Sequence, residues 1–295
     1  MELNQMRYVV AVAETGSFTR AAQRCLIVQS ALSHQVARLE KELGARLFDR
    51  SSRHVRLTPA GAAFLPAARQ CLAAAERAGA EVAAAVGEVR GSLGVGLIPT
   101  VAAVDIPRAL RDYRERFPEV RINLRVGASE HLLDEVKNGT VDLAFLGLPT
   151  AAALDGVRSR ELARDRLVAV VAPEHPLAQE DCVDLQRLSA EVFVDLPART
   201  AGREQSDRAF AAAGLTRNVA FEVTTADFMM ARLIQHNLCI AMLASTYAPQ
   251  LPGLTTVDIT DGPERVEYLI WNEPRLTPAA NAFLHLLGTP VGTGS

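Results

Sequence analysis

Apolar residues recur at helical spacing over the first 43 residues, and residues that favour helix ends divide this stretch into three short segments. The first segment predicts a helix over 4–15, which Gly16 is expected to end. Ser17 is a favourable N-cap for a second helix over 18–25. A turn of three or four residues then leads to a third helix over 29–43. Two short helices joined in this way are typical of a helix-turn-helix unit.

The third predicted helix, 29–43, is expected to bury one face and to expose the other. Its buried stripe comprises apolar residues at helical spacing, namely Leu32, Val36, Leu39 and Leu43. The opposite face, near the start of the helix, carries the polar residues Gln29, Ser30, Ser33 and His34. Such a helix fits the major groove of duplex DNA, where short polar side chains let the backbone approach the base edges. We therefore predict that these four polar residues bind DNA.

An alternating pattern rich in arginine follows this helix. Leu47 and Phe48 are apolar, and the next ten residues, DRSSRHVRLT, predict a strand-like hairpin. A hairpin in this position would act as a wing beside the recognition helix. The hairpin carries Arg50, Arg53 and Arg56, and such a wing is expected to place arginines on phosphates or in the adjacent minor groove.

The formal net charge of −3 conceals an uneven distribution of charged residues. Residues 1–65 carry nine Lys or Arg against five Asp or Glu, giving +4, whereas the rest of the chain carries 22 against 29, giving −7. A small basic segment on an acidic body is typical of a nucleic-acid binder joined to a domain with another role. A chance fluctuation in surface charge would give the same imbalance, so the residue spacing carries more weight.

A long amphipathic helix is predicted over 59–90. Thr58 followed by Pro59 is a favourable start, because the hydroxyl can cap the helix and proline fits its first turn. Apolar residues then alternate at spacings of four and three: Phe64, Ala68, Cys71, Ala75, Ala78, Val82, Ala85 and Val89. Such a seam favours the pairing of two helices, and its alanines permit a close approach. We interpret it as a dimerisation helix; the alternative is an alanine-rich helix packed on its own body.

Strand and helix patterns alternate from Gly91 onward, which predicts an open α/β sheet. The expected strands are 93–97, 122–126, 141–146, 167–171, 193–196, 220–223, 238–243 and 268–271. The expected helices are 105–117, 129–138, 203–213, 227–236 and 278–287. Ligands of such sheets bind beyond the carboxyl ends of the strands.

Four hydroxyl residues lie where an expected strand gives way to an expected helix: Thr100, Ser129, Thr200 and Thr225. A hydroxyl beside the free N–H groups of a helix start can hold a carboxylate or another anion. Each of the four, taken alone, is better explained as a plain N-cap. Arg199 is either a partner for a carboxylate or a solvated residue. Taken together, the four hydroxyls predict a small-molecule effector that is polar or anionic, such as a carboxylate.

The run from Ser17 to Gly61, SFTRAAQRCLIVQSALSHQVARLEKELGARLFDRSSRHVRLTPAG, resembles the winged helix-turn-helix of the LysR-type transcriptional regulators without a gap. The phrases GSLGVGLIPT, FPEVRINLRVG, LLDEVKNGTVDLAF and APEHPLA resemble, more loosely, the effector-binding domain of that family. By this resemblance, the effector-binding domain is similar in fold to periplasmic solute-binding proteins. The chain is thus expected to be a ligand-responsive regulator that binds double-stranded DNA.

The residue patterns and this resemblance predict a winged helix-turn-helix domain at 1–58, a linker helix at 59–90 and an effector-binding domain at 91–295. One subdomain of the last would comprise about 92–162 and 267–290, and the other about 163–266. Two crossover strands would form the hinge, and the ligand would lie in the cleft. The resemblance also implies an antiparallel pair of linker helices, a homodimer or homotetramer, and an operator with an interrupted inverted repeat.

The family pattern also assigns roles to individual positions. The positions that match its DNA contacts are Gln29, Ser30, Ser33, His34 and Arg53, and those that match its effector contacts are Thr100 and Ser129. Val28 stands where the family usually has a Ser or Thr cap, at a cost of about 1 kcal/mol. Ser30 replaces the usual proline, and His34 replaces a common arginine, a permanently charged bidentate donor. These departures affect which DNA sequence the protein is expected to prefer, and not whether it binds DNA.

Motifs for other classes of function are missing from the sequence. It has no GxSxG elbow, P-loop, HExxH or dinucleotide-binding motif, so we expect no enzyme activity, no cofactor and no metal. Cys182 and Cys239 are expected to be inert or buried thiols rather than a redox pair. The first residues lack a secretion signal and no apolar run reaches about 18 residues, which predicts a cytoplasmic protein without a membrane partner. The basic N-terminal segment argues against the alternatives, a solute-binding protein and an α/β enzyme.

Overall fold

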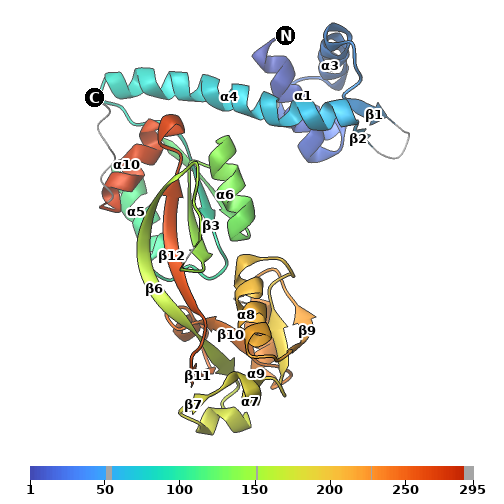
Figure 1. The fold of residues 1–295 in the computed structure, drawn as a ribbon. Coiled ribbons are helices and arrows are strands. Elements are labelled where there is room, and N and C mark those ends of the chain that lie inside the picture. Colours follow the sequence, from blue (N-terminus) through green and yellow to red (C-terminus); the bar gives the residue numbers. More distant parts are fainter. Residues whose placement is uncertain (51–54, 151, 227, 289–295) are drawn as a thin grey trace. The chain divides into compact units, whose positions relative to one another are not determined.

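The computed structural model describes residues 1–50, 55–150, 152–226 and 228–288 (Figure 1). The chain forms two compact units, Met1–Gly91 and Ser92–Ser295, which are described in turn. Across the described ranges, no helix combines the length and the apolar character needed to cross a bilayer.

The N-terminal unit is a helical head followed by a long helix. Its elements are α1 (Leu3–Thr15), α2 (Phe18–Arg24), α3 (Gln29–Leu43), β1 (Phe48–Arg50), β2 (Val55–Leu57) and α4 (Pro59–Ala85). Gly16 ends α1 in the left-handed region at φ 61°, and Gly44 ends α3 at φ 66°. The Ser17 hydroxyl caps α2 by accepting a hydrogen bond from the backbone N–H of Arg20. The sequence therefore located these helix ends to within one residue.

The core of the head lies where α1, α2 and α3 meet the hairpin. Leu32, Val36 and Leu39 of α3 are fully buried, and Phe18 packs edge-to-face on Phe48 with ring centroids 5.7 Å apart. The prediction for Leu43 was wrong, because its side chain is 40% exposed. Leu43 is the last residue of α3, where the helix has passed the edge of the core.

The long helix α4 is shorter than predicted. It has 27 residues, so it is about 40 Å long at 1.5 Å per residue, and it ends at Ala85 rather than at residue 90. Gly87 takes a φ of 86°, and the backbone N–H of Glu88 donates to the carbonyl of Ala83. This left-handed C-terminal cap ends the helix, so Val89 does not extend the helical seam.

The C-terminal unit contains an eight-stranded sheet and helices. Seven strands follow the order β4-β3-β5-β12-β6-β11-β7, and β10 also pairs with β6. The strands are β3 (Gly91–Leu97), β4 (Val120–Val126), β5 (Leu143–Leu148), β6 (Arg158–Val171), β7 (Cys182–Val183), β10 (Ala241–Ala244), β11 (Thr255–Ile259) and β12 (Glu264–Trp271). A separate parallel pair consists of β8 (Val192–Asp195) and β9 (Asn218–Glu222).

The helices of this unit mostly lie where the sequence placed them. They are α5 (Ile106–Arg116), α6 (Ser129–Asn138), α7 (Leu185–Leu188), α8 (Ala201–Ala212), α9 (Phe228–Gln235) and α10 (Pro278–Leu286). The sequence missed α7, β7 and β11. The first two are only four and two residues long, and β11 alternates polar and apolar residues at one side of the sheet. Such short or half-exposed segments give a weak periodic signal.

The strands β6 and β12 each pass between the two predicted subdomains of this unit, about 92–162 with 267–290 and about 163–266. They run antiparallel beside each other over Arg158–Arg166 of β6 (Figure 1). The rest of β6, Leu167–Val171, pairs with β10 and β11 instead. The sequence pattern predicted only 167–171 of β6, because the first half of the strand is rich in charged residues. The crossover points expected near 162 and 266 fall within these two strands.

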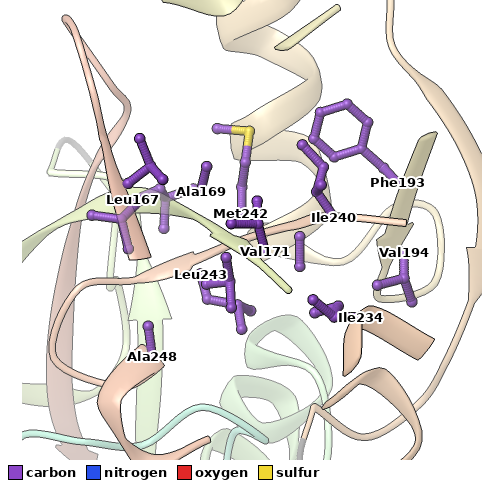
Figure 2. Packing of buried hydrophobic residues seen from close by; sticks show 14 of the residues in the cluster. Leu167, Ala169, Val171, Phe193, Val194, Ile234, Ile240, Met242, Leu243 and Ala248 are labelled. Carbon is purple, nitrogen blue, oxygen red and sulfur yellow. The ribbon is translucent and has the colours of Figure 1, made fainter. Parts of the chain in front are cut away.

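The largest apolar core of the unit surrounds the second half of β6. Figure 2 shows Val171 of β6, Val194 of β8 and Ile240 beside β10 in one cluster, with Ile234 of α9 packed against them. Strands buried on both faces explain the almost continuous apolar runs at 167–171 and 240–244. This core fixes the β8–α8 connection, which forms one wall of the cavity described below.

Candidate nucleic-acid interface and ligand cavity

The polar residues predicted on α3 share one accessible face of the head. Gln29, Ser30 and His34 are exposed and Ser33 is half-buried, while the opposite face of α3 is fixed in the core. The Gln29 side-chain amide donates a hydrogen bond to the Ser33 hydroxyl at 3.0 Å. Because the buried side of α3 holds the helix rigidly, these polar groups present a fixed pattern of donors and acceptors.

The start of α3 lacks a side-chain cap. Val28 occupies the N-cap position with an extended backbone and makes no side-chain hydrogen bond with any described residue. Its side chain is 68% exposed, so the N–H groups of the first helical turn lie beside an open surface. Free N–H groups at a helix start, together with the helix dipole, favour an anion such as a phosphate.

The hairpin after α3 has the predicted antiparallel form. Phe48 pairs with Leu57, Asp49 with Arg56 and Arg50 with Val55. The backbone of Arg50 thus belongs to β1, and Arg56 is exposed on β2. Arg53 lies outside the described residues.

The C-terminal unit encloses a cavity of about 280 Å³. Three of the four hydroxyl residues predicted from the sequence, Thr100, Ser129 and Thr200, line it together. Thr225 does not line it, and its neighbour Thr224 does. The two threonines are adjacent in the connection between β9 and α9, and the sequence pattern did not decide which of them faces the cavity.

The three hydroxyls on the cavity wall are already engaged in hydrogen bonds. Thr100 accepts one from Arg265 at 3.0 Å. The Ser129 oxygen lies 3.1 Å from the carbonyl oxygen and 3.2 Å from the backbone nitrogen of Gly147, and Thr200 donates to the carbonyl of Pro197. Arg199 is exposed, has a positive φ of 68° and does not line the cavity.

Arg265 is the main cavity residue that the sequence pattern did not predict. It belongs to β12, lines the cavity and is only 6% exposed. Its Nη1 donates to Thr100, whereas Nε and Nη2 have no hydrogen-bond partner among the described residues. Burial lowers the pKa of this guanidinium, and the nearby carboxylates of Glu267 and Asp165 act in the opposite direction. A charged residue inside the strand ERVEYLIW was the available signal.

Glu267 is buried two positions along β12 and does not satisfy the free donors of Arg265. Its carboxylate accepts hydrogen bonds from the backbone N–H groups of Ala102 and Ala103. Glu267 Oε1 lies 4.0 Å from Arg265 Nη2, which is too long for a hydrogen bond. Glu267 therefore balances part of the buried charge while holding the chain segment that follows Thr100.

Gly147 leaves the space that the Arg265 guanidinium occupies. A Cβ atom at this position would lie 2.1 Å from Nη2 and 2.6 Å from Cζ of Arg265. The hydrogen bonds of Ser129 hold the backbone of Gly147 in place. The sequence requirement here is for the smallest residue, because a larger one would displace the guanidinium.

The second charged residue on the cavity wall, Asp195, forms an ion pair with Arg217, which does not itself line the cavity. Its Oδ2 lies 2.6 Å from Nη2 of Arg217, whose side chain is almost fully buried and also pairs with Asp207. The Arg217 guanidinium stacks over Phe193 and Phe210. Burial raises the pKa of Asp195, and Arg217 opposes this shift. This network holds the β8–α8 wall of the cavity.

Two helix N-termini also border the cavity. Ser129 is the first residue of α6, and Thr200 is the N-cap of α8; both line the cavity, as do Ala201 and Gly202. The positive ends of these helix dipoles favour an anionic ligand.

Cys182 and Cys239 do not line the cavity. Cys239 is buried in the apolar core, which raises its pKa to about 11, and Cys182 is exposed with its sulfur 3.0 Å from the Thr260 hydroxyl oxygen. Both thiols are free. A buried thiol with a raised pKa is a poor nucleophile at neutral pH.

The comparison with family models identifies the chain. Residues 3–62 match the model described as a bacterial regulatory helix-turn-helix protein of the lysR family, and residues 87–289 match the LysR substrate binding domain. The protein belongs to the LysR family. It is a transcriptional regulator with a DNA-binding helix-turn-helix and an effector-binding domain, and it is not an enzyme. The predicted family and fold class are thereby confirmed.

Individual relatives cover nearly the whole chain. The transcriptional dual regulator GltC of Bacillus subtilis is 31% identical over 287 residues, covering 96% of this chain and 95% of GltC. The HTH-type transcriptional activator CmpR of Synechocystis is 29% identical over 291 residues, with coverages of 97% and 94%. The crystal structure of CbnR, a LysR family transcriptional regulator, shares the fold with a TM-score of 0.72 at 24% identity, covering 98% of both chains.

Proposed function

We propose that this protein is a ligand-responsive, sequence-specific regulator that binds double-stranded DNA through α3 and senses a small polar or anionic metabolite in the cavity of its C-terminal unit. The proposal that α3 binds DNA rests on its exposed polar face. The opposite face is held in the core by the buried residues Leu32, Val36 and Leu39. CbnR has also been crystallised as a full-length protein in complex with its target DNA, and its fold is shared at a TM-score of 0.71.

Two groups of residues are proposed to contact DNA: one discriminates between DNA sequences, and the other supplies most of the affinity. Gln29, Ser30, Ser33 and His34 contact base edges or nearby backbone, and Arg50 and Arg53 contact phosphates beside them. Phosphate contacts supply most of the affinity and make it depend on salt, whereas contacts with base edges supply the specificity. Since the target is chromosomal DNA, we place the protein in the cytoplasm.

The effector contacts that we propose are Thr100, Ser129 and Thr200, which line the cavity. Thr225, also predicted from the sequence, does not line it, whereas its neighbour Thr224 does. A ligand in this cavity changes DNA affinity only if it binds two conformations of the protein with different affinity. The β6–β12 pair is the candidate hinge, because both strands pass from one part of the unit to the other.

We assign residues 1–58 to DNA binding, 59–90 to dimerisation and 91–295 to effector binding. In the last, about 92–162 with 267–290 and about 163–266 form the two subdomains. A homodimer, or a homotetramer built from it, presents two heads to an interrupted inverted repeat.

The α4 seam offers a direct test of dimerisation. Cys71, Ala75 and Ala78 are exposed within the N-terminal unit, which supports a role in contact with a second copy. Ala75→Glu places a charge on this seam and is expected to convert the protein to monomers. Light scattering after size-exclusion chromatography measures the mass. Ala74→Glu, an exposed position off the seam, is the matched control and should leave the mass unchanged; equal masses for both variants would contradict the assignment.

His34→Ala tests the role of α3 in discrimination. We expect the variant to lose about tenfold in affinity for its operator while keeping its affinity for unrelated DNA, because a base-edge contact is worth about 1–3 kcal/mol. Gel-shift titrations with both DNAs measure the two affinities. Equal losses on both DNAs would reassign His34 to a phosphate contact.

The function as a whole is tested by a gel-shift titration with the DNA upstream of the protein's own reading frame. We expect a retarded band whose affinity falls steeply as the salt concentration rises. Absence of the band at low salt would refute the proposed function.

A further inference from the structure

We propose that Arg265 is the residue that selects the ligand, and that the ligand is an organic monocarboxylate with an apolar body whose carboxylate binds the Nε and Nη2 groups of Arg265. This inference rests on the proposed effector role of the cavity and specifies the chemistry of its ligand.

The free donors of Arg265 form the edge that carboxylates bind. Nε and the adjacent Nη2 present parallel N–H groups, which match the two oxygens of a carboxylate. The third nitrogen, Nη1, is already bonded to Thr100 at 3.0 Å, so the guanidinium is held in position. Among the described residues, no acceptor satisfies the other two nitrogens, although Arg265 is only 6% exposed. Buried donors without an acceptor are costly, and an anionic ligand would supply the missing bonds.

The packing around Arg265 preserves this free edge. Gly147 leaves room for the guanidinium, since any Cβ at that position would lie 2.1 Å from Nη2. The carboxylate of Glu267, 4.0 Å from Nη2, is hydrogen-bonded to the backbone N–H groups of Ala102 and Ala103 instead. A ligand carboxylate therefore need not displace a protein acceptor from either nitrogen.

The charge around the cavity fits one negative group. Asp195 is paired with Arg217 at 2.6 Å, and the Glu267 carboxylate, 4.0 Å from Nη2 of Arg265, is hydrogen-bonded to backbone N–H groups. Arg265 is therefore the cation on the described wall that lacks a hydrogen-bonded anionic partner. The N-termini of α6 and α8 add partial positive charge. A second carboxylate on the ligand would find no second guanidinium or ammonium group on the described wall, and Asp195 would repel it.

The remaining wall is largely apolar. It includes Ile98, Val126, Leu167, Leu196, Met242 and Leu243. An inorganic anion would leave this surface without a partner, whereas the hydrocarbon part of an organic acid would cover it. A cavity of about 280 Å³ accommodates a small organic acid of this kind.

The decisive comparison uses matched acids and amides on the full-length protein. Isothermal titration calorimetry at pH 7 measures the binding of hexanoate and cyclohexanecarboxylate, and of hexanamide and cyclohexanecarboxamide, which have the same shape without the charge. We expect at least one of the acids to bind at least tenfold more tightly than its amide. Succinate and sulfate should bind more weakly than the acid. This part of the test needs no variant, so it does not depend on how a substitution folds.

Two variants test whether Arg265 causes the difference in affinity between the acids and the amides. Arg265→Gln should weaken binding of the acid by roughly 10- to 100-fold, the value of hydrogen bonds to a charged group, and should leave amide binding unchanged. Gly147→Ala should weaken acid binding in the same direction, because the new methyl group displaces the guanidinium. Arg199→Gln is the control, since Arg199 is an exposed arginine that does not line the cavity.

The outcomes separate this inference from the proposed function. The inference is overturned if neither acid binds, if the amides, succinate or sulfate bind as tightly as the acid, or if Arg265→Gln binds the acid as well as the unaltered protein does. Gel-shift titrations on the same samples test DNA binding independently. If the protein retards DNA but does not bind the acid, only this inference is refuted. If it binds the acid but does not retard DNA, only the proposed function as a DNA-binding regulator is refuted.

Discussion

Gly61→Ala will destabilise the N-terminal unit by about 3 kcal/mol or more and will thereby abolish DNA binding. Gly61 lies in the first turn of α4, where a Cβ atom would lie 2.1 Å from the carbonyl oxygen of Leu47 and 2.9 Å from the Leu57 side chain. The backbone at Leu47 cannot move aside easily, because its N–H donates to Glu40 and its carbonyl accepts from Thr58. The hairpin or the start of α4 must therefore shift. Hydrogen exchange of the α1 and α2 amides measures the loss of local stability.

Gly79→Ala is the matched control for this prediction. Gly79 lies in the same helix, and nothing lies within 4 Å of a Cβ at this position. Alanine should there stabilise α4 by about 0.5–1 kcal/mol, because it restricts the unfolded chain and favours the helix. The chain's single tryptophan, Trp271, lies in β12, so its fluorescence should show that neither variant alters the C-terminal unit. Equal stability of the head in both variants would contradict the proposed clash.

Arg217→Met is expected to destabilise the C-terminal unit by about 3–5 kcal/mol, the usual cost of leaving one member of a buried ion pair without its partner. The Arg217 side chain is 2% exposed and lies 2.6 Å from Asp195. Methionine retains much of the packing on Phe193 and Phe210, so the loss isolates the charge. Urea unfolding followed by Trp271 fluorescence measures it. Arg208→Met is the control; its pair with Glu204 is exposed and worth about 0.5 kcal/mol or less.

The effect of Arg217→Met should depend on pH in a defined direction. Burial already raises the pKa of Asp195, and removal of Arg217 raises it further. The folded variant then binds this proton more tightly than the unfolded chain does, so its stability falls as the pH rises from the unfolded pKa, about 3.9, through the folded pKa. The variant should therefore be closer in stability to the unaltered protein at pH 5 than at pH 8. A difference that is constant between these pH values would show that Asp195 stays charged in the variant.

The head was predictable from sequence because its determinants are local. Gly16 and Gly44 end helices through their positive φ, and Ser17 and Thr58 cap helices through hydrogen bonds to residues three positions away. The apolar stripe of α3 likewise follows from spacing alone. The errors lie at helix ends, as with Leu43, where burial depends on how far the core extends rather than on periodicity.

The ligand cavity was only partly predictable for the opposite reason. Thr100, Ser129 and Thr200 were found because a hydroxyl before a helix is a local signal. Arg265 was missed because its significance depends on Gly147 and Thr100, which are more than 100 positions away in the sequence. The sequence already predicted a polar or anionic effector, but the assignment of its carboxylate to Arg265 needed the tertiary structure.

The sequence by itself determined the family, the three-helix head, the long helix that follows it and the alternating α/β character of the rest, since capping, periodicity and a contiguous motif act over short distances. Only the tertiary structure decided which charged side chains are buried and which of their hydrogen bonds are left open. Burial is a property of all the elements packed around a group, so Arg265 and Arg217 gain their roles from strands and helices that meet only after the chain has folded.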